Sequence, residues 1–394
     1  MKQITDPDRC TGCSACRLLC PQKCIDMGYD DEGFYIPFID EALCMECQAC
    51  ANRCPANMCL SLSECTPIKV LAARLKDDIF LNNSSSGGVF VGMAQHVLGT
   101  SGNAVFGCVF DDDIIARHIY VTEIGDIAPM QGSKYVQSDV GNTYLQAKEI
   151  LENGSKVFYT GCPCQIAGLY AFLGEDYENL ITADLICHGV PSPLLFKRYI
   201  NKLELQLGEK VTDFKFRSKQ KFGWSLTAKA ETRTKTKIII SNSDPYYSSF
   251  LQGFTYRKAC YTCKYASGNR VADITLGDFW GVEGYHPQFY DARGVSVVLI
   301  NSDKGNVFFE QLHGKFEILE STFDIATMKN RNLLYPSSKP EIRKFAYDNI
   351  NNEEIDLFGN ACYNIGIKNH VKAFAKRITP PFLLHKYKVI KHKY

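Results

Sequence analysis

The first part of the fold is decided by the run Cys10-Thr11-Gly12-Cys13-Ser14-Ala15-Cys16-Arg17-Leu18-Leu19-Cys20-Pro21, which recurs 34 residues later as Cys44-Met45-Glu46-Cys47-Gln48-Ala49-Cys50-Ala51-Asn52-Arg53-Cys54-Pro55. All four cysteines and the proline repeat. This spacing is typical of paired 4Fe–4S clusters, in which the fourth cysteine of each run binds the other cluster. We therefore predict one cluster on Cys10, Cys13, Cys16 and Cys54, and a second on Cys44, Cys47, Cys50 and Cys20. Zinc sites, the alternative, do not show a doubled four-cysteine run that ends in proline each time.

Length and composition fit a protein of two or three domains. The chain has 394 residues, of which 45% are hydrophobic, and 18 cysteines. Its 44 Lys and Arg residues balance 43 Asp and Glu residues, which gives no reason to expect nucleic acid as a partner. The N-terminus lacks the apolar stretch of a secretory signal, and no apolar run approaches the roughly 20 residues of a membrane span. We expect a cytoplasmic protein whose cysteines are reduced and bind metal.

The distribution of cysteines, apolar residues and charge predicts a fold of the α+β and α/β type in four segments. Residues 1–66 are predicted as a two-cluster ferredoxin-like module of the (βαβ)2 type, residues 67–153 and 154–335 as two parts of a mixed α/β domain, and residues 336–394 as a helical tail. From Leu357 onward there are eight basic residues and no acidic one. This tail is either a solvated segment or a weak contact to an anionic membrane surface or acidic partner.

Alternating helix and strand patterns after the first module predict a parallel sheet. Helices are expected over 67–77, 89–98, 142–153 and up to Leu173, and strands over 104–110, 114–121, 156–160, 180–186 and 273–276. Parallel α/β sheets bind ligands beyond the carboxyl ends of their strands. Two polar loops accompany this pattern. The Ser/Gly loop 82–88 precedes a helix and either offers N–H donors to an anion or is an ordinary capped loop; the second loop spans 132–138.

A second set of cysteines is scattered through the long domain. Cys164 and Cys187 follow predicted strands, and Cys260 and Cys263 form a C-x2-C pair. We predict that these four bind a third 4Fe–4S cluster. A zinc site and a redox-active dithiol are the alternatives. Cys162 lies close enough in sequence to replace Cys164. The cysteines without assigned chemistry are Cys24, Cys59, Cys65, Cys108, Cys162 and Cys362.

Several motifs in this order resemble the coenzyme F-420 hydrogenase/dehydrogenase beta-subunit family of iron–sulfur flavoproteins. The matching stretches are Ser84-Ser85-Ser86-Gly87-Gly88, Gly132-Ser133-Lys134-Tyr135, Thr160-Gly161-Cys162-Pro163-Cys164-Gln165, Asp184-Leu185-Ile186-Cys187-His188-Gly189-Val190-Pro191-Ser192, Phe216-Arg217-Ser218-Lys219, Cys260-x2-Cys263 and Ala272-Asp273-Ile274-Thr275-Leu276-Gly277-Asp278-Phe279-Trp280-Gly281. Each motif is weak, but together they are specific. The chain departs from the simplest hydrogenase subunits in its fused two-cluster module and in having Cys162 where Thr is usual.

The resemblance implies bound FAD in the mixed α/β domain. The residues implied around the flavin are Ser84, Ser86, Gly87 and Gly88 in the first loop, and Ser133, Lys134, Tyr135 and Ser138 in the second. A lysine beside the pyrimidine end of a flavin stabilises the anionic reduced ring, although Lys134 can equally be an ordinary surface charge. Relatives of this kind reduce either a deazaflavin coenzyme or pigments, so the fold does not fix the substrate.

These features predict an oxidoreductase in which a ferredoxin or another redox protein supplies single electrons to the clusters, and FAD passes them as hydride to a small organic substrate. The candidate proton donors are His188, His118 and Asp184, each of which can equally be a structural side chain. The alternative is an electron-relay or F-420-reducing subunit of a larger hydrogenase or dehydrogenase complex.

Overall fold

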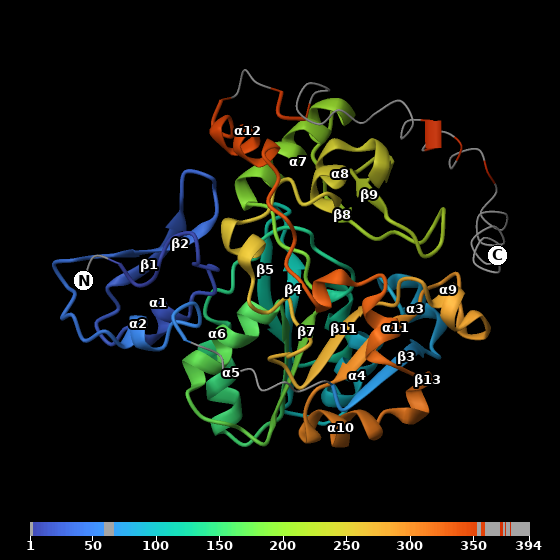
Figure 1. The fold of residues 1–394 in the computed structure, drawn as a ribbon, viewed down its shortest axis with the longest axis horizontal. Helices are drawn as coiled ribbons and strands as arrows, with labels where there is room; N and C mark the ends of the chain where they lie inside the picture. Colours follow the sequence, from blue (N-terminus) through green and yellow to red (C-terminus); the bar gives the residue numbers. More distant parts are fainter. Residues whose placement is uncertain are drawn as a thin grey trace.

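A mixed eight-stranded sheet in the order β13-β3-β12-β11-β7-β6-β4-β5 forms the centre of the protein (Figure 1). The computed structural model describes residues 3–58, 67–352, 356–358, 371, 372, 375 and 379. The strands of the sheet are β3 (Lys69–Leu75), β4 (Ala104–Phe110), β5 (Ala116–Val121), β6 (Val157–Gly161), β7 (Leu180–Leu185), β11 (Ile274–Asp278), β12 (Ser296–Ile300) and β13 (Phe316–Ser321). The predicted mixed α/β fold class is confirmed.

The four strands β4, β6, β7 and β11 are parallel, as the alternating pattern predicts. The strands on either side of them pair antiparallel, so the prediction of a parallel sheet holds for the centre alone. The central strands are buried on both faces: Phe158 lies in one hydrophobic cluster, and its neighbours Val157 and Tyr159 lie in another. Because successive side chains of a strand point to opposite faces, both faces must be covered by helices.

Helices α4 (Val89–Leu98) and α10 (Asp303–Glu310) cover one face, and α5 (Thr143–Glu152) and α6 (Pro163–Leu173) cover the other. The structure confirms the predicted helix 89–98, and α5 lies within one residue of the predicted helix 142–153. Helix α6 ends at Leu173 as predicted but begins at Pro163, inside the stretch expected to be a loop. The shorter helices of the body are α3 (Asp78–Asn83), α9 (Val282–Tyr285), α11 (Phe323–Thr327), and the 3-10 helices η1 (Ile124–Met130), η2 (Ser241–Ser243), η3 (Lys258–Thr262), η4 (Pro287–Phe289), η5 (His313–Lys315) and η6 (Arg331–Leu333).

The predicted helix over 67–77 is wrong, because this segment forms strand β3. Val70, Ala72 and Ala73 are fully or almost fully buried between β12 and β13. A short apolar run that is buried on both sides has no polar face, so its periodicity does not separate a helix from a central strand. The outcome depends on β12 and β13, which lie more than 200 residues further along the chain.

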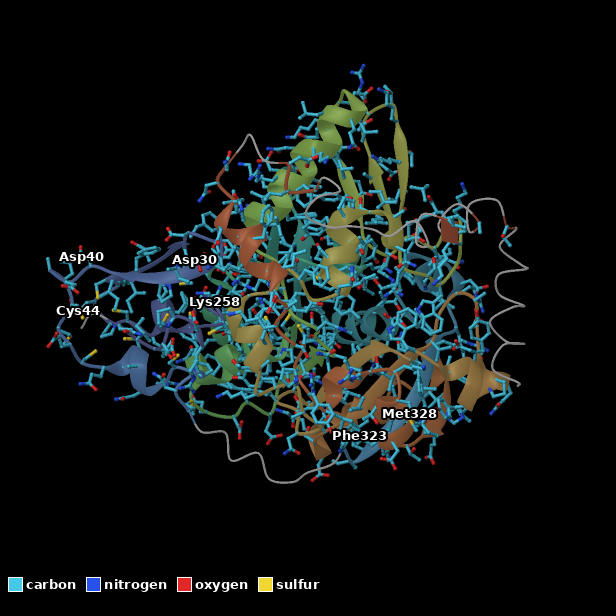
Figure 2. All side chains as sticks on the ribbon, turned by 45° about the horizontal axis from the view of Figure 1, so that its top comes forward. Asp30, Asp40, Cys44, Lys258, Phe323 and Met328 are labelled. Carbon is cyan, nitrogen blue, oxygen red and sulfur yellow. The ribbon has the colours of Figure 1, made fainter. Side chains whose placement is uncertain are left out.

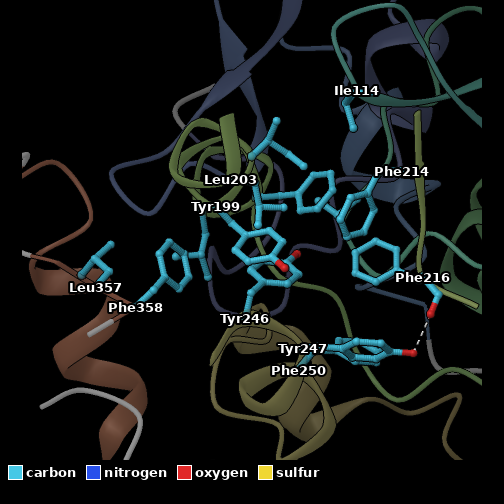
Figure 3. Packing of buried hydrophobic residues seen from close by; sticks show 14 of the residues in the cluster. Ile114, Tyr199, Leu203, Phe214, Phe216, Tyr246, Tyr247, Phe250, Leu357 and Phe358 are labelled. Atoms are coloured by element: carbon cyan, nitrogen blue, oxygen red, sulfur yellow. Dashed lines mark hydrogen bonds between the residues drawn. The ribbon is translucent and has the colours of Figure 1, made fainter. Parts of the chain in front are cut away.

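A second lobe packs above the sheet around an aromatic core (Figure 3). It consists of α7 (Pro193–Leu207), β8 (Asp213–Lys215), β9 (Thr227–Glu231), β10 (Thr236–Ile240), α8 (Pro245–Leu251) and α12 (Ile342–Asp348). Tyr199 stacks on Tyr246 at a ring distance of 4.7 Å, and the Tyr247 hydroxyl donates to the Phe216 carbonyl at 2.8 Å. Leu357 and Phe358 belong to the same core. The rest of the basic C-terminal segment lies largely outside the described residues.

The N-terminal module projects from one side of the body (Figure 1). It contains α1 (Ala15–Leu19), β1 (Ile25–Tyr29), β2 (Tyr35–Ile39) and α2 (Ala49–Asn52), with β1 and β2 paired antiparallel. Buried arginines of the body fix it: Arg343 forms an ion pair with Glu32, and Arg257 donates to the carbonyls of Cys10 at 2.5 Å and Tyr35 at 2.9 Å. The segment boundaries at 66, 153 and 335 stay predictions. In the described part of the chain, no helix has the length and hydropathy of a bilayer span.

Candidate functional site

A cavity of about 610 Å³ opens at the carboxyl ends of the parallel strands. Gly161 and Cys162 at the end of β6, Ile186 to Val190 after β7, and Gly277 and Asp278 at the end of β11 contribute to its wall. Its size lies in the range of small-molecule sites, and its walls combine apolar and aromatic side chains with a few polar groups. The topology therefore forms a ligand site at the predicted edge of the sheet.

The two loops that the sequence singled out both contribute to the wall of this cavity and contact each other. The predicted residues in its wall are Ser84, Ser86, Gly88, Ser133, Lys134, Tyr135 and Ser138. The Ser85 and Ser133 hydroxyls hydrogen-bond to each other at 2.9 Å, which joins the two loops. Gly87 lies outside the wall: a Cβ there would come within 2.2 Å of the Ala73 carbonyl of β3. Glycine is thus required at position 87 because the loop crosses close to a strand.

Lys134 is not an ordinary surface charge. Its ammonium group donates to the carbonyl oxygens of Pro129, Met130, Gln131 and Gly132 at 2.9 to 3.2 Å, and burial lowers its pKa to about 8. These carbonyls belong to the end of η1 and to the loop after it. The lysine therefore holds the second loop in shape and places a cation in the cavity wall.

Sequence reasoning missed the ion pair between Arg217 and Asp278, although both residues lie in motifs that it quoted. The side chain of Arg217 is 1% exposed and donates to both carboxylate oxygens of Asp278, at 2.5 and 3.0 Å. The same guanidinium donates to the Ser85 carbonyl at 3.1 Å and lies over the Trp280 ring. Trp224 donates to Asp278 at 2.7 Å. Arg217 thus connects the Ser/Gly loop to the end of β11, a contact that no local pattern reveals.

The structure separates the three candidate proton donors. Asp184 is fully buried, forms an ion pair with Arg270 at 2.8 Å, and is not part of the cavity wall. His118 lies in the wall and is buried; its Nε2 is 3.2 Å from the Thr160 carbonyl, and its Nδ1 is 3.2 Å from the Ser138 hydroxyl. Since a carbonyl only accepts, Nε2 carries the proton and Nδ1 accepts. Burial lowers the pKa of His118 to about 4, which leaves it neutral. His188 also lines the cavity and is exposed.

The structure brings the N-terminal cysteines into the two predicted groups. Burial, and after it the charges of Cys10 and Cys54, raise the pKa of the Cys13 thiol to about 11. Burial, followed by the charges of Cys13, Cys10 and Cys54, raises the pKa of the Cys16 thiol. Cys20, Cys44, Cys47 and Cys50 line one small cavity together with the unassigned Cys24, whose sulfur is 3.3 Å from that of Cys20. The fourth cysteine of each run therefore lies with the other run.

The later cysteines also gather at one place. Burial and the charges of Cys187, Cys263 and Cys260 raise the pKa of Cys164. A hydrogen bond between the thiols of Cys162 and Cys187 raises the pKa of the first and lowers that of the second. Five cysteines thus surround this position, and Cys162 and Cys187 reach the cavity wall. Within the described ranges, no group of three or more His, Cys, Asp or Glu side chains converges on a single point as one metal ion requires.

The first and third cysteine groups adjoin each other. Gly168 of α6 lies so close to Cys13 that a Cβ there would be 2.9 Å from the Cys13 Cβ and 3.1 Å from its sulfur. The charge of Cys13 also contributes to the raised pKa of Cys164. The cysteine groups therefore form a series that begins in the projecting module and ends at the cavity.

Comparison with known proteins assigns both parts of the chain. Residues 154–324 match the family described as the C-terminal part of the coenzyme F420 hydrogenase/dehydrogenase beta subunit, and residues 9–58 match a 4Fe–4S dicluster domain. Residues 154–324 therefore have the sequence of the C-terminal part of this beta-subunit family, and the N-terminal module is a 4Fe–4S dicluster domain. The family resemblance and the 4Fe–4S module expected from the sequence are both confirmed. This chain is thus an oxidoreductase-type electron-transfer protein with an N-terminal 4Fe–4S domain.

Similar proteins match either the N-terminal module or most of the chain. An uncharacterized ferredoxin of Methanocaldococcus jannaschii is 35% identical over 75 residues, which are 19% of this chain and 87% of that protein. The F subunit of the F420H2 dehydrogenase of Methanosarcina mazei is 20% identical over 330 residues, 81% of this chain and 86% of that protein. A chain of the F420-reducing NiFe hydrogenase complex of Methanosarcina barkeri aligns with a TM-score of 0.47 and 19% identity, covering 68% of this chain and 90% of that one. The family match and the long match to the dehydrogenase favour the subunit alternative over a free-standing reductase.

Proposed function

We propose that this chain is the electron-transfer subunit of a larger hydrogenase- or dehydrogenase-type complex, and that it binds FAD and a deazaflavin coenzyme of the F420 type in its cavity. The family match over residues 154–324 and the long match to an F420H2 dehydrogenase subunit support this function. One observation carries the proposal: the wall of the cavity contains residues of both polar loops, Cys187 of the third group, and the neighbouring Cys162.

The cysteine residues fit three 4Fe–4S clusters. Burial and neighbouring cysteines raise the pKa of the Cys13 and Cys164 thiols. Iron is bound by thiolates, and the positive charge of the iron would offset the repulsion between thiolates held this close together. We assign Cys10, Cys13, Cys16 and Cys54 to the first cluster, Cys44, Cys47, Cys50 and Cys20 to the second, and Cys164, Cys187, Cys260 and Cys263 to the third. Cys162 would then lie between the third cluster and the cavity.

The cavity residues fit FAD. Helix α4 begins directly after Gly88, so its N-terminal N–H groups favour an anion such as the diphosphate of FAD. Lys134 provides a cation in the wall of the cavity, and Tyr135, Phe250 and Trp280 provide aromatic surface for flat rings. When bound, the clusters carry single electrons and the flavin exchanges them for a hydride.

The chain's own residues position the ligands and handle the proton. Neutral His118 fixes the Ser138 hydroxyl as a donor toward Nδ1, and Gln165 donates to the same hydroxyl oxygen at 2.9 Å, so this corner of the cavity is held rigid. Arg217 and Asp278 hold the Ser/Gly loop against the end of β11. Of the three candidate proton donors, His188 is the one that is both in the wall and exposed, and we assign it the exchange of a proton with solvent.

A free-standing reductase that takes electrons from a redox protein and reduces an organic substrate is the second candidate. The exposed position of His188 in the cavity wall favours it, because a small substrate could reach this residue without a partner subunit. A panel of oxidants added to the reduced protein separates the two candidates. Reoxidation by a deazaflavin alone supports the first, and rapid reoxidation by an unrelated organic compound supports the second.

The direct test is to mix anaerobically purified, oxidised protein with chemically reduced F420 coenzyme and to follow the return of deazaflavin fluorescence together with bleaching of the flavin and cluster absorbance. We expect both changes to occur together. The variant Arg217→Lys should weaken the response, and Glu320→Gln, an exposed residue on β13, serves as the matched control. A protein that carries flavin and clusters but does not respond to the reduced coenzyme would rule out the deazaflavin as its ligand.

A further inference from the structure

The two halves of the cysteine repeat share one loop conformation. Gly12 and Ser14 in the first half have φ angles of 67° and 64°, and the equivalent residues Glu46 and Gln48 have φ angles of 54° and 61°. In both halves an aspartate at the start of the loop, Asp6 or Asp40, accepts a hydrogen bond on its side chain from the backbone N–H two residues later, at 2.9 Å. The two loops are therefore structural equivalents that are 34 residues apart in sequence.

The body covers the inner part of the first loop, residues 10–14, while residues 6–9 are exposed. Gly168 of α6 lies against Cys13, and Gln137 donates to the Thr11 carbonyl at 3.4 Å. Arg257 donates to the Cys10 carbonyl, and Lys258 forms an ion pair with Asp8 at 2.9 Å. Gly12 and Ser14 are buried as a result. In the first half of the repeat, this loop therefore packs closely against a protein surface that has cations at its edge.

The second loop, 40–48, presents the same backbone to solvent. Every residue in it except Cys44 is exposed, with Leu43 59% and Met45 60% exposed. Asp40 and Cys44 lie at the outer end of the module, away from its junction with the body, where Lys258 is found (Figure 2). Exposed apolar side chains that surround a ligand-binding cysteine group are a sign of an interaction surface.

The charge of this loop defines its partner. Asp40, Glu41 and Glu46 are exposed and the loop contains no Lys or Arg. A hydrogen bond to the N-terminal amino group, and the charge of that group, lower the pKa of Glu46, so Asp40 and Glu41 provide most of the uncompensated negative charge. Lys23 is an exposed cation that follows Gln22, whose amide contacts the Met45 sulfur at 3.3 Å. An acidic rim around an apolar centre attracts a surface with the opposite arrangement of charge. The covered loop meets the same kind of surface, since the body places Arg257 and Lys258 against it.

We propose that the loop 40–48 is the surface through which this chain exchanges electrons with a redox protein whose cofactor edge is apolar and ringed by Lys and Arg. This inference rests on the proposed function and deepens it. It implies that the second cluster exchanges electrons with the partner protein, whereas the first cluster faces the body of this chain. It also implies that a strongly acidic ferredoxin is a poor partner. In the exchange, a single electron leaves the reduced chain and reduces the partner's cofactor.

The test uses a cytochrome c with a lysine-ringed haem edge as the probe. The full-length protein is reduced with a limited amount of dithionite, and the rate of reduction of ferric to ferrous haem is followed by stopped flow at several salt concentrations. We expect the wild-type rate to fall as salt rises, and the variant Asp40→Asn/Glu41→Lys to react about tenfold more slowly at low salt. The variant Asp303→Asn/Glu320→Lys, with the same change in charge on exposed residues of α10 and β13, should react like the wild type.

Two controls separate this proposal from the proposed function. The rate of reduction by dithionite and the cluster spectrum should be the same in all variants, because a small reductant needs no docking surface. If the wild type lacks clusters, the proposed function fails before docking is tested. If the loop variant reduces the cytochrome as fast as the wild type, or if the wild type reacts faster with an acidic ferredoxin than with the cytochrome, the docking surface is wrong while the proposed function stands. Glu41→Gln alone should also slow the reduction of the cytochrome, but by less than the double variant does.

Discussion

The cysteines of the N-terminal module and those of the body form similar groups by different means. Cys10 to Cys54 lie within a single short stretch, and tight loops with positive φ angles gather them. Cys164, Cys187, Cys260 and Cys263 come from the start of α6, the loop after β7, and the region of η3. The short spacing between cysteines brings the two N-terminal groups together. The order of the strands in the sheet brings the cysteines of the third group together. Damage to the sheet should therefore affect the last group alone.

The largest expected effect is the loss of a whole cluster by exchange of one cysteine. Cys54→Ser should remove the cluster of the first run, Cys10 to Cys16, and leave that of the second run; Cys20→Ser should do the reverse. Iron and sulfide analysis should show a loss of about four irons in each variant. Spectra of the reduced proteins identify which cluster remains. Cys24→Ser, a neighbour of Cys20, is the control and should keep all clusters, and loss of a cluster in that variant would contradict the assignment.

A smaller effect is expected from the buried ion pair that holds the cavity together. Arg217→Met leaves Asp278 buried without its partner and should lower the free energy of unfolding of the body by about 3–5 kcal/mol. Both tryptophans of the chain, Trp224 and Trp280, lie beside this pair, so their fluorescence reports unfolding of the body. The third cluster should be lost before the other two. Lys210→Ala, which breaks an exposed pair with Asp113, should change nothing measurable.

The stability of the body should depend on pH through His118. Burial lowers its pKa from 6.5 to about 4, so between these values the unfolded chain binds a proton that the folded chain does not. The stability that neutral His118 contributes is therefore complete above pH 6.5 and is lost as the pH falls toward 4, by about 3 kcal/mol in total. Residues 1–66 contain no histidine. Burial also lowers the pKa of His188 and His286, so denaturant unfolding followed by tryptophan fluorescence should show a clearly smaller slope in His118→Gln than in the wild type. An equal slope in both proteins would reject the prediction.

The smallest effect concerns the exposed contact between module and body. Lys258→Ala removes the ion pair with Asp8, in which both side chains are largely exposed, and should cost less than about 1 kcal/mol. Arg257→Ala, at the neighbouring buried position, should loosen the module far more. Amide hydrogen exchange within residues 3–58 would measure this difference. Equal protection of the two variants would mean that the buried arginine does not fix the module.

The sequence allowed prediction of those parts whose cause is local. The cysteine repeat, helix α4 and strand β4 were predicted at their observed positions because spacing, periodicity and turn residues specify them. Strand β3 was predicted as a helix because its burial comes from β12 and β13. The polar residues that assemble the cavity and the junction, Arg217, Asp278, Arg257 and Arg343, gave no local signal, because each finds its partner across a large separation in sequence. The gathering of dispersed cysteines depends on the same long-range order.

The measurement that tests this account most directly is the iron and flavin content of protein purified without oxygen. If the three cysteine groups hold clusters and the cavity binds FAD, as we propose, the protein contains about twelve irons and one FAD per chain. Cys263→Ser should retain about eight irons together with its FAD, because Cys263 does not line the cavity. A wild-type protein with eight irons or fewer and no flavin would contradict the central claim that the cysteine series ends at a bound flavin.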